Sequence, residues 1–264
     1  MGIMFQNVTY TVTVPLYCIL YLFTSPIAQP TADPFSLLAV DHVDLSLLPI
    51  SNIICFGFPA VMMSLPSPSM VAPLAHYAWD AIWQIFPATQ NAFQLIIKQL
   101  TPASSPTTAT KVNTYRHAVR VPYNYILVLC VISQLSFLGI ALTPASAVPL
   151  TWQPLFAEVT LSSAFVPYLP WDTPAVVPAS VLVSGDGCAV LAKTFFQWDL
   201  YCGGAAILIW ALYLHSVSRP NKNLAGMLPK VIFWVLVGGV HGAAAIVLWG
   251  RDEVMLEQKV TKKE

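Results

Sequence analysis

Long runs of apolar residues, separated by short polar connectors, dominate the sequence and predict a series of membrane-crossing helices. Each run is near the ~20 residues that a helix needs to cross the hydrocarbon core of a bilayer. Six spans are expected, at residues 9–28, 47–65, 70–97, 121–142, 188–215 and 231–249. An irregular, Pro-rich segment at 143–186 separates the fourth from the fifth, and a crossing by residues 150–166 within it would make seven. We therefore expect a single all-α transmembrane domain over residues 1–264, a bundle of six or seven helices.

Proline and glycine interrupt several of these runs. Pro15 can kink the first span, Gly57 and Pro59 break the second, and Pro87 should kink or divide the third. Residues 150–166 are expected to form a short or re-entrant helix, and two interpretations of them stay open. They form an ordered loop, or they line a cavity as a lid or pocket wall, because irregular backbone at membrane depth is tolerated only where it is buried or borders a cavity.

Composition agrees with a membrane protein and excludes several other classes. The chain is 56% hydrophobic and 9% charged, against about 25% charged residues in a soluble domain. Its formal net charge is zero, so no basic face is available to bind nucleic acid. The connector 98–120 contains basic residues and no acidic one, which makes it the best candidate for a cytoplasmic loop. The five cysteines have no metal-ligand spacing and no CxxC pair, and we expect neither a metal nor a cofactor.

The third apolar run carries polar side chains on one helical face. His76, Asp80 and Gln84 are spaced four apart, and Tyr77 and Trp83 flank Asp80. A carboxylate within the hydrocarbon costs about 2.5–3.5 kcal/mol, so such residues usually face a bundle interior and often mark function. Two interpretations remain open: these side chains serve a reaction, or they form a hydrogen-bonded clasp between helices.

Three acidic side chains are candidates for catalysis by proton transfer: Asp80, Asp199 and Glu158. Burial raises the pKa of a carboxyl group, which can then stay protonated near neutral pH and donate its proton. Such a donor suits chemistry on an alkene or epoxide, because surrounding aromatic faces attract the cation that forms. We expect Asp80 and Asp199 to converge on an apolar chamber, although Asp199 can instead pair with Lys193 or His215.

Aromatic and polar neighbours of the two aspartates are the candidate substrate-binding residues. They are His76, Tyr77, Trp83, Gln84, Phe196 and Trp198. The alternative for the tryptophans and tyrosines is a place in the aromatic belts at the membrane interfaces. His241, alone on an apolar Gly-rich run, is interpreted as a packing or hydrogen-bonded histidine.

Motifs for several other chemistries are missing from the sequence. It contains no GxSxG, HExxH or Walker motif and no aspartate-rich DDxxD cluster. Without an aspartate-rich diphosphate site, ionisation of a prenyl diphosphate is disfavoured. Protonation of an already prenylated substrate remains open.

Short motifs are distributed over most of the chain. They are Phe23-Thr24-Ser25-Pro26, Gly57-Phe58-Pro59, Leu65-Pro66-Ser67-Pro68, Ala81-Ile82-Trp83-Gln84-Ile85-Phe86-Pro87, Phe196-Gln197-Trp198-Asp199, and Leu248-Trp249 before Arg251-Asp252-Glu253. Together they resemble a family of fungal integral-membrane proteins whose characterised members are terpene cyclases of meroterpenoid pathways, of the ascochlorin, ascofuranone and macrophorin type. Gly250 departs from the family pattern, in which an acidic residue precedes Arg251.

The resemblance implies cyclisation of the farnesyl-type chain of a prenylated phenol or quinone-like compound. An acid would protonate a terminal epoxide or olefin, without metal. The resemblance assigns no catalytic residue, so Asp80, Asp199 and Glu158 rest on the physical argument alone. Expected partners are this hydrophobic substrate, membrane lipid and other enzymes of the pathway, in the endoplasmic reticulum or a related membrane. The rival functions are transport of a hydrophobic metabolite and a non-catalytic scaffold.

Overall fold

The computed structural model describes residues 8–25, 40–101, 108–169, 171, 186–218 and 224–261. These residues form helices and connecting turns, with no strand among them, so the all-α prediction is confirmed. Four helical segments in the described chain are long and apolar enough to cross a membrane: His42–Ser64, Tyr115–Leu142, Val190–Ser218 and Leu228–Leu256. Many large apolar side chains on the helices are exposed, as expected where lipid replaces water.

The predicted third span is divided into two helices, and neither is long enough to cross. Helix α6 covers Pro73–Gln84 and α7 covers Phe86–Leu100, with Ile85 between them at φ −101° and ψ 14°. Pro87 lies in the first turn of α7, where its missing N–H costs nothing. The prediction that Pro87 divides this run is therefore confirmed, and residues 70–97 do not form one continuous span.

The first and second runs differ in length from the spans expected of them. Helix α2, Tyr10–Thr24, is a shorter apolar helix, and residues 26–28 of the expected span lie outside the described residues. The second run is one continuous helical path made of α4 (His42–Asn52), the π-helical turn η2 (Ile53–Gly57) and α5 (Phe58–Ser64). The expected break at Gly57 and Pro59 is this π-helical turn, because Pro59 cannot donate the backbone hydrogen bond that a regular helix needs there.

The Pro-rich segment contains short helices that do not cross. They are η3 (Ala145–Ala147), α9 (Gln153–Glu158) and α10 (Leu161–Phe165). Thr160 and Ser163 cap α10 reciprocally through a capping box. A seventh span at 150–166 is therefore not formed, while residues 170 and 172–185 lie outside the described residues.

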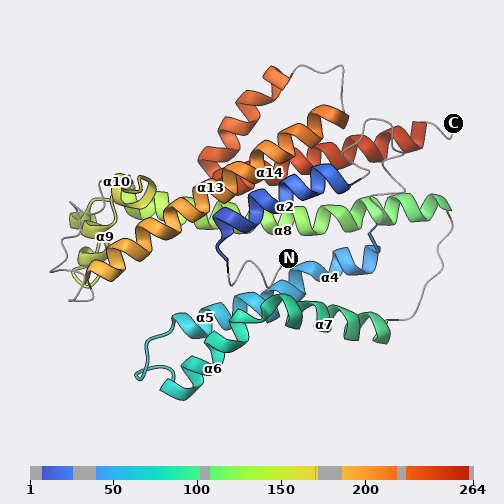
Figure 1. Ribbon diagram of the computed structural model, residues 1–264. Coiled ribbons are helices and arrows are strands. Elements are labelled where there is room, and N and C mark those ends of the chain that lie inside the picture. The colour runs from blue at the N-terminus through green and yellow to red at the C-terminus, as the bar shows by residue number, and fades with distance from the viewer. Residues whose placement is uncertain are drawn as a thin grey trace.

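Helix α8 (Thr108–Leu142) runs between two groups of helices (Figure 1). On one side lie α2, α13 (Asp186–Ser218) and α14 (Leu228–Thr261), and on the other side lies α4, followed by α5, α6 and α7. The core between α13 and α14 is built of small and β-branched residues: Ala211, Val231, Ala243, Ala244 and Val247. Small side chains let helix backbones approach closely, which is the usual way to pack helices in lipid.

Gly203 and Gly204 are points of close contact between α13 and its neighbours. A Cβ atom on Gly203 would overlap Cδ1 of the Tyr10 ring in α2. A Cβ atom on Gly204 would lie 2.7 Å from Cγ1 of Val240 and 3.0 Å from Cε1 of His241 in α14. The glycine pair therefore sets how closely α2 and α14 approach α13.

Helix α14 is broken in its middle and continues past its predicted end. Gly239 has φ 65° and ψ −176°, a backbone conformation that favours glycine, and the direction of the helix changes there (Figure 1). After the break, α14 extends beyond residue 249 to Thr261. Arg251 is only 5% exposed, and Glu253 accepts a hydrogen bond from Arg120 of α8 at 2.6 Å. The charged tail is therefore helical and joined to α8.

Ion pairs join the ends of α4 and α7. The Lys98 ammonium lies 2.6 Å from Asp41 and 2.8 Å from Asp44. Its hydrogen bond lowers the pKa of Asp41 below the usual carboxyl value. The stabilisation from this carboxylate is therefore present above the ordinary pKa and is lost as the pH falls through the lower value in the folded protein.

Replacement of Gly203 by alanine should destabilise the protein. The added methyl group must displace the Tyr10 ring, and overpacking of this kind costs about 1–3 kcal/mol. Thermal unfolding in detergent, followed by tryptophan fluorescence, should show a lower midpoint for Gly203→Ala. Gly139→Ala is the matched control, because no atom lies within 4 Å of a Cβ at Gly139 in α8. Equal midpoints for the two variants would contradict the close contact between α2 and α13.

Candidate functional site

A pocket of about 770 Å³ lies between α8, α13, the break in α14 and the short helices α9 and α10. Its volume is within the ~300–1,000 Å³ typical of sites for small organic ligands. Most of its lining surface is apolar, with a few polar side chains from each wall. We call it the α8–α13 pocket.

One face of α13 forms the longest wall of the α8–α13 pocket. The lining residues lie three, four, seven and eight positions after the first, so they share a face of the helix: Lys193, Phe196, Gln197, Leu200 and Tyr201. The opposite wall comes from α8, through Leu129, Cys130, Ser133, Gln134 and Phe137. Both helices contribute polar, aromatic and aliphatic side chains to the lining.

The break in α14 lies at the same pocket. Gly238 and Gly239 line it, and a Cβ atom on Gly239 would lie 3.3 Å from Oε1 of Gln134, another lining residue. Non-helical backbone at membrane depth is tolerated where it borders a cavity. Because the break borders the pocket, its non-helical backbone is tolerated there.

The remaining wall is α10, which α13 holds by hydrogen bonds to backbone carbonyl groups. Nε2 of Gln197 donates to the carbonyl oxygens of Ser163 at 3.0 Å and Ala164 at 2.9 Å. The Tyr201 hydroxyl donates to the carbonyl of Phe165 at 2.7 Å. These side chains satisfy the last carbonyls of a short helix. The interpretation of this segment as a pocket wall is confirmed, since residues 158, 159 and 163–165 line the pocket.

The three candidate acids occupy different places. Glu158, at the end of α9, lines the α8–α13 pocket. Asp199 lies behind the pocket and accepts hydrogen bonds from the backbone N–H groups of Tyr10 at 3.2 Å and Thr11 at 2.6 Å, so it caps the first turn of α2. Asp80 is exposed on α6, which packs on α5.

Asp80 and Asp199 therefore do not converge on one chamber, and that expectation is wrong. Figure 1 shows α6 in the group of helices on the other side of α8 from α13. The separation arises because the third run is divided at Ile85, which leaves α6 packed on α5 instead of crossing beside α13.

The candidate substrate-binding residues are similarly divided. Phe196 lines the pocket, whereas the indole N–H of Trp198 donates to the carbonyl of Tyr168 at 2.7 Å. Trp83 contacts Phe56, with ring centroids 5.8 Å apart. The other three lie with Asp80 on α6: His76, Tyr77 and Gln84.

The sequence analysis did not single out two features of the site. Gln197 and Tyr201 anchor α10, and the Tyr10 hydroxyl lies 2.8 Å from Nε2 of His241, which lines the pocket. A usable signal was the motif Phe196-Gln197-Trp198-Asp199 followed by a glycine pair. Among the described residues, no three His, Cys, Asp or Glu side chains are grouped closely enough to hold a metal ion.

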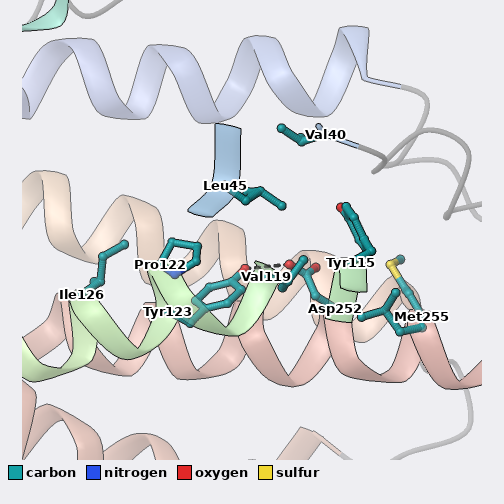
Figure 2. A pocket seen from close by; sticks show the side chains of 10 residues that line it. Val40, Leu45, Tyr115, Val119, Pro122, Tyr123, Ile126, Asp252 and Met255 are labelled. Atoms are coloured by element: carbon teal, nitrogen blue, oxygen red, sulfur yellow. Dashed lines mark hydrogen bonds between the residues drawn. The ribbon is translucent and has the colours of Figure 1, made fainter. Parts of the chain in front are cut away.

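A second, smaller pocket of about 260 Å³ lies between the start of α4, α8 and the last part of α14 (Figure 2). The Tyr123 hydroxyl donates to Asp252 at 2.7 Å across this pocket, and Nε of Arg251 donates to the same carboxylate at 2.9 Å. Both carboxylate oxygens of Asp252 therefore already accept hydrogen bonds. Together with the bond between Arg120 and Glu253, these contacts join α8 to α14.

These features define a class: an all-helical membrane protein with a large, mostly apolar pocket between its helices. The family follows from comparison with known proteins. The model of the CtvD domain matches residues 1–256, so the chain belongs to the CtvD domain family. The resemblance to fungal terpene cyclases is thereby confirmed at the level of the family.

Several similar proteins are named terpene cyclases. The chain is 24% identical over 260 residues to terpene cyclase ascI of Acremonium egyptiacum, which covers 96% of this chain and 62% of that protein. It is 26% identical over 251 residues to terpene cyclase ctvD of Aspergillus terreus, and the match covers 94% of this chain and 65% of that protein. For terpene cyclase atmA of Aspergillus flavus the identity is 23% over 252 residues, covering 94% and 64%. The chain thus spans less than two thirds of the length of these relatives, and no solved structure matches it.

Replacement of Gln197 by leucine should detach α10 from α13. Two hydrogen bonds of about 0.5–1.5 kcal/mol each are lost, so amide hydrogen exchange in residues 161–165 should become about tenfold faster or more. The matched control is Gln84→Leu, an identical change at an exposed position on α6. Unchanged exchange in Gln197→Leu would show that α10 is held by other contacts.

Proposed function

We propose that this chain acts as a membrane-bound terpene cyclase. It closes rings in the farnesyl-type chain of a prenylated aromatic compound, with Glu158 protonating a terminal epoxide or olefin. The observation that carries this proposal is the position of Glu158. It is the one of the three candidate acids that lines the α8–α13 pocket. The names of the relatives support the same class of activity.

The pocket suits such a substrate in size and in lining. A volume of about 770 Å³ accommodates a prenylated aromatic compound, and the mostly apolar walls favour its hydrocarbon chain. Phe137, Phe165, Phe196 and Tyr201 present aromatic rings at the walls. Aromatic faces attract cations, so these side chains stabilise the positive charge that develops during ring closure.

The reaction balances without a metal or a redox partner. The Glu158 carboxyl group gives its proton to the epoxide oxygen or the terminal olefin carbon, and a cation forms. The π electrons of internal double bonds close the rings, and loss of a proton ends the reaction. Glu158, an exposed residue, takes a proton back from water. The product is an isomer of the substrate, so its mass is unchanged.

We also propose where the reaction takes place and which reaction supplies its substrate. The lipid-soluble substrate enters the pocket from the membrane, in the endoplasmic reticulum or a related endomembrane. A prenylated precursor must come from a prenyl-transfer reaction, and association with the enzymes that supply it is proposed on that basis.

The test is to feed microsomes containing the protein with a farnesylated phenol and with its terminal epoxide, and to analyse products by mass spectrometry. A new isomer of unchanged mass supports a cyclase. Redistribution of the unchanged compound between vesicle and medium would instead indicate a transporter. Neither result, with the protein present and folded, would indicate a scaffold.

Replacement of Glu158 by glutamine should lower kcat/KM for cyclisation by about 100-fold or more, the range expected for loss of a general acid. Asp80→Asn is the matched control and should stay within about twofold of the wild type, because Asp80 is exposed on α6 and does not line the pocket. Loss of activity in Asp80→Asn with full activity in Glu158→Gln would move the acid to α6 and overturn this assignment.

A further inference from the structure

A histidine–tyrosine pair lies at the α8–α13 pocket, away from Glu158. The Ser163 hydroxyl donates to the backbone carbonyl of Glu158, and Ser163 lies beside Gln197 of α13. His241 packs against Gly204, seven residues further along α13. Seven residues of helix rise about 10 Å. The wall that carries Glu158 and the side chain of His241 are therefore at different levels of the same pocket.

Several contacts hold this pair in one geometry. The Tyr10 hydroxyl lies 2.8 Å from Nε2 of His241, and the two ring centroids are 5.7 Å apart. Asp199 fixes the start of α2 by accepting from the backbone N–H of Tyr10, and the Tyr10 ring lies against Gly203. The position of the His241 ring thus depends on three elements: α2, α13 and α14.

The two nitrogens of His241 have different surroundings. Nε2 is occupied by Tyr10. Nδ1 has no hydrogen-bond partner in the part of the chain that the structure describes. It is also not fully buried. When Nε2 carries the proton and donates it to the Tyr10 oxygen, Nδ1 keeps a free lone pair.

We infer that His241 is the base that ends the cyclisation, and that Tyr10 is the positioning residue that orients its ring. This inference rests on the proposed cyclase function. Nδ1 of His241 takes a proton from the carbon next to the last cation. The electron pair of the broken C–H bond becomes the new C=C bond. The imidazole becomes an imidazolium, hydrogen-bonded to the Tyr10 oxygen, and later releases the extra proton to water.

Formation of the cation and its neutralisation are thereby assigned to two different side chains of one pocket. Glu158 determines whether the cation forms, and His241 determines how it is neutralised. A cation that meets no base is trapped by water, which gives a product 18 Da heavier than the isomer, or it loses a different proton and gives a shifted double bond. The ratio of these products therefore reports on His241, and the total consumption of substrate reports on Glu158.

The experiment uses the full chain in lipid nanodiscs with a farnesylated phenol and its terminal epoxide as probes. In His241→Gln, which retains hydrogen-bonding groups but is no base, the share of the wild-type alkene should fall at least tenfold. Total consumption should fall less than threefold. In Tyr10→Phe the ring of His241 loses its fixed partner, and the same share should fall by about threefold. In Glu158→Gln the consumption should fall while the product ratio stays unchanged.

His117→Gln is the matched control, since it is the identical change at an exposed histidine of α8 that does not line the pocket, and its product ratio should equal that of the wild type. Thermal unfolding of each variant shows that it is folded. If His241→Gln lowers all products in proportion, or leaves their ratio unchanged, the role of His241 as the terminating base is wrong. If the wild-type protein cyclises neither probe, the proposed function fails instead, and the two failures are distinguished.

Discussion

Backbone N–H and C=O groups that are surrounded by lipid must find partners within the protein, and this constraint explains where the α8–α13 pocket lies. Regular helices satisfy the requirement by themselves. Two departures from regular helix, the segment of short helices that ends in α10 and the break at Gly239, border the pocket. At α10 the carbonyl groups are taken up by Gln197 and Tyr201. The pocket thus exists where irregular backbone could be placed without facing lipid.

The motif Phe196-Gln197-Trp198-Asp199 shows how one turn of helix organises this arrangement. Consecutive residues of an α-helix point about 100° apart, so four of them cover the whole circumference. Phe196 faces the pocket, Gln197 holds α10, and Trp198 holds the carbonyl of Tyr168. Asp199 holds the start of α2. Four adjacent side chains therefore fix α13 against its surroundings, and none of them repeats the task of another.

Much of the fold was predictable from the sequence because apolar length and proline position have direct physical meaning. Pro87 divides its run as predicted, and the all-α class follows from the composition. The broken course of α14 was not predictable, because Gly239 stands in a Gly-rich stretch where nothing local requires a positive φ. The helical tail was missed for a related reason. Arg251 lies past the end of the predicted span, yet it is only 5% exposed and donates a hydrogen bond to Asp252.

The sequence indicated the kinds of side chain at the candidate site, but it indicated only some of the residues that line it. Spacing showed that His76, Asp80 and Gln84 share a helical face, but it could not show that this face belongs to a short helix packed on α5. Spacing also could not distinguish an aspartate that donates protons from one that caps a neighbouring helix. Asp199 is an aspartate of the second kind, since it caps α2. Those answers depend on contacts between residues some 190 positions apart in the chain.

The break at Gly239 also bears on the length of the α8–α13 pocket. The lining face of α13, from Lys193 to Tyr201, rises about 12 Å, and the break in α14 lines the pocket near Gly204, just past that face. The position of the break therefore bears on how far the pocket extends along this face. A break placed one helical turn earlier or later in α14 would move this part of the lining by about 5 Å. The extent of the pocket would then depend on the position of a single glycine.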